Sequence, residues 1–259
     1  MKLLLLLFKG LKFGKILVSS GSMLLSIAIY AWIFGLPYAI GFVALLLVHE
    51  MGHYIAARKR GLDVGLPTFI PFVGAWIQLK ELPHDVETEA YVGLAGPLVG
   101  SIGALACFYA ARETHSTMLL ALAYSGFFLN LFNLIPISPF DGGRVTAAIS
   151  PKIWFFGVPV LVGLFIYRPS PLLIMMAVLA FPNVVKAWKG QETEAEKAYY
   201  TIPAETRLGY AAAYLALAGF LAIMCAELHA ELPQHHGDGP RPAAAADTHT
   251  GRASDERVE

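Results

Sequence analysis

A series of apolar segments, most of them long enough to cross a lipid bilayer, constrains this 259-residue chain most strongly. A transmembrane helix needs about 17–25 mostly apolar residues. That length rule predicts helices at roughly 16–34, 37–57, 90–111, 117–137, 153–167, 170–187 and 208–228. The segment at 153–167 is short, so it is either tilted or only partly spanning. The sequence therefore predicts an all-α polytopic membrane protein with six to seven transmembrane helices.

The amino-acid composition supports a membrane protein and gives no indication of a nucleic-acid partner. Charged residues make up 15% of the chain, whereas soluble domains carry about 25%. Basic and acidic residues balance at 19 each, and no basic stripe indicates a nucleic-acid partner. Cys107 and Cys225 fall in apolar segments without a CxxC partner, which favours small buried side chains over a disulfide or a metal pair. The expected surroundings are a lipid bilayer, and the oligomeric state is left open.

The distribution of basic residues predicts the orientation. Of the 19 Lys and Arg residues, 14 fall on one side of the predicted spans and three fall in the C-terminal tail. The loops on the other side hold only Arg112 and Arg168. We therefore expect a multi-pass protein of a bacterial or archaeal cell membrane, with the N-terminus and the Arg58–Arg60 cluster in the cytoplasm.

The pentapeptide His49-Glu50-Met51-Gly52-His53 lies near the end of the second apolar segment. On an α-helix, His49 and His53 project from one face, so both imidazoles can bind one Zn²⁺. Glu50 lies beside them, placed to take a proton from water that the metal activates. Ionisable groups inside a membrane helix are costly, which indicates a function. His49 lies about 14 Å from the cytoplasmic end of this helix, so we expect a site that opens to the cytoplasm.

A catalytic zinc usually has three protein ligands, and Asp141 is the candidate for the third. Pro136 and Pro139 should break the fourth helix before its cytoplasmic end. Gly142-Gly143 then allows a turn that points the carboxylate back into the bundle. The predicted topology places Asp141 in the same half of the membrane as the two histidines. The alternative is a helix-terminating turn with a solvated aspartate.

These motifs resemble the site-2 protease family of intramembrane zinc metalloproteases. That family pairs HExxH with a downstream Asn-x-x-Pro-x-x-x-x-Asp-Gly motif, and the matching residues are His49, Glu50, His53, Asn133, Pro136, Asp141 and Gly142. The resemblance covers roughly residues 37–145. It departs after Ala95-Gly96-Pro97, where many members carry Asn shortly afterwards and this chain has Leu98-Val99-Gly100-Ser101. The chain looks like a compact member without a PDZ or other appended soluble domain.

The resemblance implies Zn²⁺ held by His49, His53 and Asp141, with Glu50 as the catalytic general base. It implies that Asn133 binds the substrate backbone or the developing oxyanion, the alternative being an interhelical hydrogen bond. The implied activity is hydrolysis of peptide bonds within or near transmembrane segments of membrane-anchored substrates.

The same resemblance and the changes in composition divide the chain into five regions. We expect a basic interfacial segment (1–15), an intramembrane metalloprotease core (16–190), a cytoplasmic linker (191–207), an additional transmembrane helix (208–231) and a disordered tail (232–259).

Residues 66–80, between the second and third predicted spans, are apolar but contain Pro67 and Pro71, which disfavour a helix. Trp76–Leu79 favours a strand, with Val73-Gly74 as a bend. We therefore expect a short membrane-embedded β-hairpin or extended segment whose edge can pair with an extended peptide. The alternative is an interfacial loop.

Four glycines in the third predicted span, Gly93, Gly96, Gly100 and Gly103, are spaced three, four and three residues apart. This spacing places them on one helix face and predicts close backbone packing there.

Two other functional classes stay open. A membrane metalloprotease that trims prenylated proteins also uses HExxH, but it takes a Glu as third ligand, and Glu227 lies near the opposite end of the last predicted span. A non-proteolytic zinc-binding membrane protein, either a transporter or a pseudoprotease, would leave Glu50 without an assigned purpose.

Overall fold

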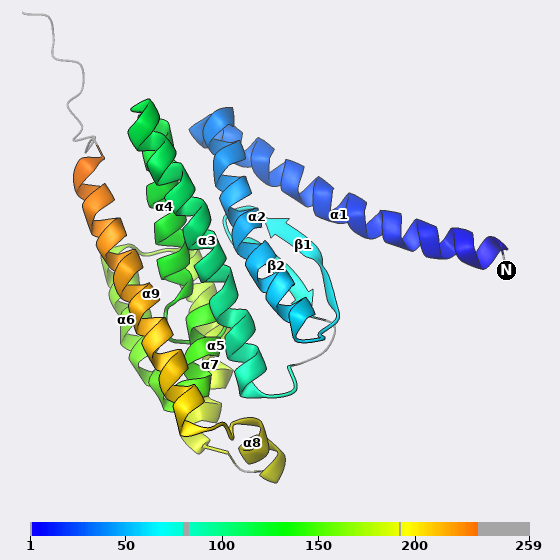
Figure 1. Ribbon diagram of the computed structural model, residues 1–259, viewed down its shortest axis with the longest axis vertical. Helices are drawn as coiled ribbons and strands as arrows, with labels where there is room; N and C mark the ends of the chain where they lie inside the picture. The colour runs from blue at the N-terminus through cyan, green and yellow to red at the C-terminus, as the bar shows by residue number, and fades with distance from the viewer. Residues whose placement is uncertain (1, 80–82, 192, 233–259) are drawn as a thin grey trace, which may run out of the picture.

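Helices dominate the computed structural model, which describes residues 2–79, 83–191 and 193–232 (Figure 1). The chain runs through two helices, a pair of strands and a further series of helices. In order these are α1 (Lys2–Phe34), α2 (Leu36–Lys59), β1 (Val64–Ile70), β2 (Gly74–Leu79), α3 (Val86–Thr114), α4 (Thr117–Asn133), α5 (Asp141–Ile149), the 3₁₀ turn η1 (Pro151–Ile153), α6 (Trp154–Tyr167), α7 (Pro171–Lys189), α8 (Glu194–Tyr199) and α9 (Ala204–Glu231).

Within the described residues, five helices are long and apolar enough to cross a membrane. They are α1 from Ile16 onward, α2, α3, α7 and α9. Two further apolar segments are shorter, namely α4 and the stretch Pro151–Tyr167 that includes α6. A multi-pass membrane protein is therefore supported, while the count of six to seven spans stays a prediction because it depends on these two short segments.

Helix α3 lies at the centre of the bundle, with α2 on one side and α4 and α5 on the other (Figure 1). Helices α2 and α3 approach each other closely at Gly52, where a Cβ atom would lie only 2.5 Å from the carbonyl oxygen of Ala95. Gly126 allows a similar approach of α4 to Ala104 on α3. The four glycines predicted to share one face of the third span also lie against neighbouring helices, Gly96 and Gly103 against α2, Gly100 against α4 and Gly93 against α5.

Helix α1 diverges from the bundle and contacts mainly α2 and β1 (Figure 1). Three hydrogen bonds join α1 to the strand region: Ser19 Oγ donates to Pro67 O at 2.6 Å, Phe69 N donates to Ser22 Oγ at 3.1 Å, and Phe72 N donates to the Tyr30 hydroxyl at 2.9 Å. The first strand is thus held on its outer side by polar groups of α1.

Strands β1 and β2 pair antiparallel, with Thr68 opposite Trp76 and Phe69 opposite Ala75. The sequence predicted a β-hairpin or extended segment here, with a strand at 76–79 and a bend at Val73-Gly74. The structure has two strands, and the first of them, β1, contains Pro67. The proline is tolerated because the ladder is irregular between Val64 and Pro67 and because Pro occurs at strand edges. That this hairpin lies at membrane depth stays a prediction.

The predicted helix at 117–137 is wrong at its C-terminal end, since α4 ends at Asn133. Residues 134–140 form turns that include Pro136 and Pro139, whose rings cannot continue a helix. A helix that the sequence did not predict, α5, then begins at Asp141. The predicted third span begins earlier than expected, because Asp85 caps α3 by accepting a hydrogen bond from Thr88 N at 2.7 Å.

The predicted linker contains the short helix α8, which begins with a capping box between Thr193 and Glu196. Tyr199 at its end donates a hydrogen bond to Glu89 Oε2 on α3 at 2.6 Å. Burial raises the pKa of Tyr199, and the Glu89 carboxylate raises it further, so the hydroxyl keeps its proton and remains a donor. The predicted disordered tail lies almost wholly outside the described residues, which end at Leu232.

Candidate metal centre

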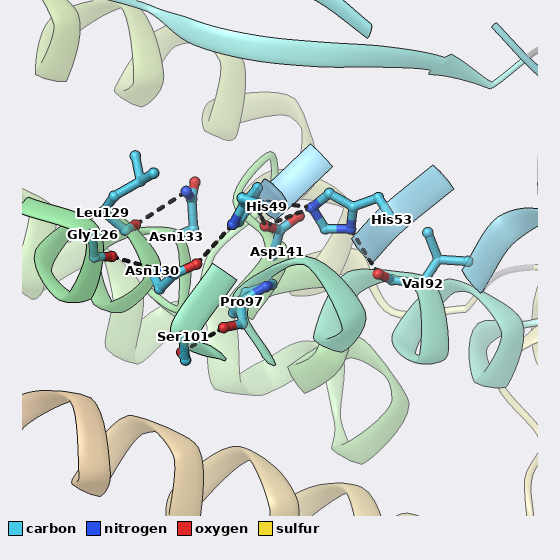
Figure 2. Close-up of polar contacts among 10 residues, drawn as sticks. All are labelled: His49, His53, Val92, Pro97, Ser101, Gly126, Leu129, Asn130, Asn133 and Asp141. Carbon is cyan, nitrogen blue, oxygen red and sulfur yellow. Dashed lines mark hydrogen bonds and ion pairs between the residues drawn. The ribbon is translucent and has the colours of Figure 1, made fainter. Parts of the chain in front are cut away.

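Three side chains that are far apart in the sequence meet at one buried point. His49 and His53 project from α2 and Asp141 from the start of α5 (Figure 2). The two Nε2 atoms lie 3.1 Å apart, and Asp141 Oδ2 lies 3.2 Å from His49 Nε2 and 3.1 Å from His53 Nε2. The exposed fractions of the three residues are 3%, 7% and 8%. The structure therefore places the three predicted ligands together, away from bulk solvent.

Helix periodicity places His49 and His53 on one face of α2, while two glycines account for the position of Asp141. Gly142 and Gly143 follow Asp141 and press against the backbone of Leu134 and Ile137, leaving no room for a Cβ atom at either position. Trp154 Nε1 donates to Gly143 O at 2.8 Å and fixes α5 from its other side. The start of α5 is thus held beneath the 134–140 turns, so the Asp141 carboxylate reaches α2.

The far nitrogen of each imidazole has an acceptor. His53 Nδ1 lies 2.7 Å from the backbone carbonyl of Val92, so Nδ1 carries the proton and donates it. His49 Nδ1 lies 2.8 Å from Asn130 Oδ1, and the Asn130 amide is oriented by donating from Nδ2 to Gly126 O at 2.7 Å (Figure 2). Both Nε2 atoms therefore present lone pairs toward the carboxylate, as metal-ligating histidines do.

This donor set fits a metal ion. With both protons on Nδ1, the two Nε2 lone pairs and an Asp141 oxygen face one another without a proton between them, which is unfavourable unless a cation joins them. Zinc ligands at about 2.0–2.2 Å in a tetrahedral arrangement lie about 3.3 Å or slightly more apart. The separations of 3.1–3.2 Å between these three atoms are close to that value. His49, His53 and Asp141 are placed to form a metal site.

Two glycines of α3 make room for this arrangement. A Cβ atom at Gly96 would overlap the His53 ring, and one at Gly100 would overlap the Asn130 amide. The sequence predicted close helix packing from these glycines, but not that imidazole and amide groups of the site would fill the space.

Glu50 is buried, with 6% of its surface exposed, and it neighbours His49 on α2. Its carboxyl interacts electrostatically with both imidazoles, with Asp141 and with Arg144. Glu50 is therefore close enough to the three candidate ligands for their charges to act on its carboxyl group. Its catalytic role stays a prediction.

The structure does not join Asn133 to the ligands. Asn133 is half-buried at the end of α4 and donates from Nδ2 to Leu129 O at 3.1 Å (Figure 2). Ser101, which follows the Gly-Pro of α3, donates to Pro97 O at 2.5 Å within its own helix. The asparagine that does contact a ligand is Asn130, which sequence reasoning missed, although an amide in the mostly apolar 117–132 stretch is a signal in itself.

Part of the chain is similar to known zinc metalloproteases. Residues 37–113 match the model of Peptidase family M50, a stretch that includes His49, Glu50 and His53 and ends before Asp141. Zinc metalloprotease MJ0392 of Methanocaldococcus jannaschii is 34% identical over 116 residues, covering 43% of this chain and 33% of that protein. The putative zinc metalloprotease Rip3 of Mycobacterium tuberculosis is 33% identical over 132 residues, covering 47% of this chain and 33% of that protein.

This chain thus spans about one third of the length of these curated relatives. A solved structure titled site-2 protease from Methanocaldococcus jannaschii aligns with 70% of this chain and 87% of its own, at 22% identity and a TM-score of 0.42. Residues 37–113 of this chain are thus similar to Peptidase family M50, and the relatives named above are zinc metalloproteases.

Proposed function

We propose that this protein is an intramembrane zinc metalloendopeptidase that hydrolyses peptide bonds within or near transmembrane segments of membrane-anchored substrates. One observation carries the proposal: two imidazole nitrogens and a carboxylate oxygen converge within a helical bundle, beside a buried glutamate. The naming of the relatives as zinc metalloproteases supports Zn²⁺ as the metal.

His49, His53 and Asp141 would hold the zinc ion. When bound there, zinc polarises a carbonyl and lowers the pKa of water toward neutrality. Glu50 takes up the proton as the water oxygen attacks the scissile carbonyl carbon. Glu50 then returns this proton to the peptide nitrogen as the carbon–nitrogen bond breaks, so the products are a carboxylate and an amine.

The membrane setting of the proposal combines the five candidate spans with the distribution of basic residues. The N-terminus and the opening of the active site face the cytoplasm of a bacterial or archaeal cell. The metalloprotease core occupies residues 16–190, flanked by the basic segment at 1–15 and the linker at 191–207. The helix at 208–231 is an additional span.

Two features are proposed to hold the substrate. A transmembrane substrate must unwind locally, because its helix hides the scissile carbonyls in hydrogen bonds. Strand β2 packs on α2, which carries two of the ligands, and only its β1 side is paired within the described two-stranded sheet. Its other edge would bind the unwound segment by strand addition. The Asn133 amide would contact the substrate backbone, since its present hydrogen bond is to its own helix.

The test is cleavage of a panel of model transmembrane substrates by purified full-length protein, with zinc content measured in parallel. Glu50→Gln is the decisive variant, because it keeps the size of the side chain and removes the base. We expect about one zinc per chain in both proteins and cleavage only in the wild type. Zinc without cleavage in either protein would favour a non-proteolytic zinc-binding membrane protein, and well-folded protein that binds no zinc would refute the proposal.

A further inference from the structure

A cavity of about 270 Å³ lies where α7 ends and α9 begins, and none of His49, His53 and Asp141 lines it. Its wall is formed by the segment around η1, the C-terminal end of α7, helix α8 and the first turn of α9. Three of its side chains are basic, Lys152, Lys186 and Arg207, and one is acidic, Glu196. The charged side chains of the wall therefore sum to plus two.

The single acidic side chain is already neutralised inside the cavity. Glu196 Oε1 lies 3.0 Å from Lys186 Nζ, and Glu196 Oε2 accepts a hydrogen bond from Thr193 N at 3.2 Å. The positive charge of Lys152 and Arg207 thus has no acidic counterpart among the residues that line the cavity.

Arg207 is held in place by the backbone. Its Nη1 donates to Ile149 O at 2.8 Å and its Nη2 contacts Tyr200 O at 3.5 Å. A guanidinium has five N–H donors, so donors remain for a ligand after these two contacts. Arg207 therefore offers a positioned cation whose orientation does not depend on the ligand.

The cavity adjoins a surface that is suited to lipid chains. Helix α7, whose end lines the cavity, is a candidate membrane span, and α6 packs beside it. Large apolar side chains of both helices face outward: Phe156 is 71% exposed, Phe181 67% and Trp188 80%. Trp188 contacts the Phe155 ring between the two helices, and tryptophan is a residue type that is enriched at membrane interfaces.

We propose that this cavity binds the phosphate of an anionic phospholipid, with the acyl chains lying along the exposed faces of α6 and α7. Lys152 and Arg207 contact the phosphate, and Lys186 keeps the Glu196 carboxylate neutralised, so that it does not repel the phosphate. Basic cavities between membrane helices recognise anionic headgroups in this way. The apolar surface beside the cavity favours a lipid over a soluble phosphate, because a soluble ion would gain nothing from it.

The experiment is native mass spectrometry of the full-length protein in neutral detergent, titrated with phosphatidylglycerol or with phosphatidylcholine. We expect one tightly bound phosphatidylglycerol per chain and binding of phosphatidylcholine at least about tenfold weaker. A lysine that lies directly beside an anionic headgroup contributes enough attraction to change binding about fivefold. Lys152→Gln should therefore weaken phosphatidylglycerol binding about fivefold, and Lys152→Gln with Lys186→Gln by about 25-fold.

Lys189→Gln is the matched control, since Lys189 lies in the same last turn of α7 but does not line the cavity. It should change binding less than about twofold. Equal binding of both lipids, equal effects of Lys152→Gln and Lys189→Gln, or inorganic phosphate binding as tightly as phosphatidylglycerol would each overturn the proposal. Helical content from circular dichroism and the zinc content confirm that each variant is folded. Repeating the titration with Glu50→Gln separates this result from the peptidase, because lipid binding needs no hydrolysis.

Discussion

The hydrogen bond between Asn130 and His49 makes the sharpest prediction about the metal centre. Asn130 is fully buried, with 0% of its surface exposed, and its Oδ1 accepts the His49 Nδ1 proton at 2.8 Å. In Asn130→Ala that N–H is left without its acceptor inside the bundle. An unsatisfied buried donor costs about 1–3 kcal/mol. The imidazole can avoid this cost by moving its proton to Nε2, but that removes the lone pair that the metal needs.

The magnitude follows in two independent ways. A cost of about 1–3 kcal/mol corresponds to about a 5- to 150-fold loss of affinity at 1.4 kcal/mol per tenfold. Loss of an outer partner of a ligating histidine typically weakens metal binding by about 10–100-fold. We therefore expect Asn130→Ala to bind zinc about 10–100-fold more weakly than the wild type, measured by competition with a chelator in detergent.

Asn133→Ala is the matched control, because it removes an amide from the same helix one turn later, where the side chain bonds only to Leu129 O among the described contacts. It should change zinc affinity less than about threefold. Asn130→Asp keeps an acceptor for His49 and should bind zinc more tightly than Asn130→Ala. If Asn130→Ala and Asn133→Ala bind zinc equally well, Asn130 does not orient His49 and the reasoning is refuted.

Three further predictions test the packing, the third ligand and the hairpin. Gly96→Ala should weaken zinc binding by more than about tenfold, because its Cβ would displace the His53 ring. Gly103→Ala should not, because its Cβ would meet only the aliphatic side chains of Val48 and Leu45, at 3.1 Å and beyond, and no group of the metal centre. Asp141→Asn should reduce zinc affinity by at least about tenfold in the chelator assay, since an amide lacks the charge; unchanged affinity would remove Asp141 from the ligand set. Ile77→Pro should impair cleavage of transmembrane substrates with zinc still bound, since proline disrupts a strand; cleavage at the wild-type rate would argue against strand addition at β2.

The parts of the site that depend on neighbouring residues in the sequence could be predicted. The helical spacing of His49 and His53 is fixed by four residues of sequence, and the structure shows the expected shared face. Asp141 was predictable because prolines end one helix and glycines allow the next segment to approach. Helix α5 itself was not predictable, since Gly142 and Gly143 are poor helix formers and the helix depends on tertiary contacts such as the Trp154 hydrogen bond.

The extent of strand β1 and the role of Asn130 could not be predicted, because both depend on contacts between distant parts of the chain. The β1 segment contains Pro67 and is completed by hydrogen bonds from α1, about 48 residues earlier in the chain. Asn130 acts through His49, 81 residues away, so its importance depends on how α4 packs against α2. Neither the contact between α1 and β1 nor the contact between Asn130 and His49 produces a periodic pattern in the sequence. The only sign of the second contact is an asparagine in a mostly apolar helix.

The glycine face of α3 serves both helix packing and the placement of the metal-centre side chains. Gly103 faces aliphatic side chains of α2, whereas Gly96 and Gly100 face the imidazole of His53 and the amide of Asn130. The same face therefore lets three helices pack closely and sets where a ligand and its orienting partner can lie. Added bulk at Gly103 can be absorbed by side-chain movement, but bulk at Gly96 or Gly100 must move the metal centre. Alanine should therefore be tolerated at Gly103 but not at Gly100, within one turn of α3. These substitutions should differ more in their effect on zinc affinity than in their effect on thermal stability.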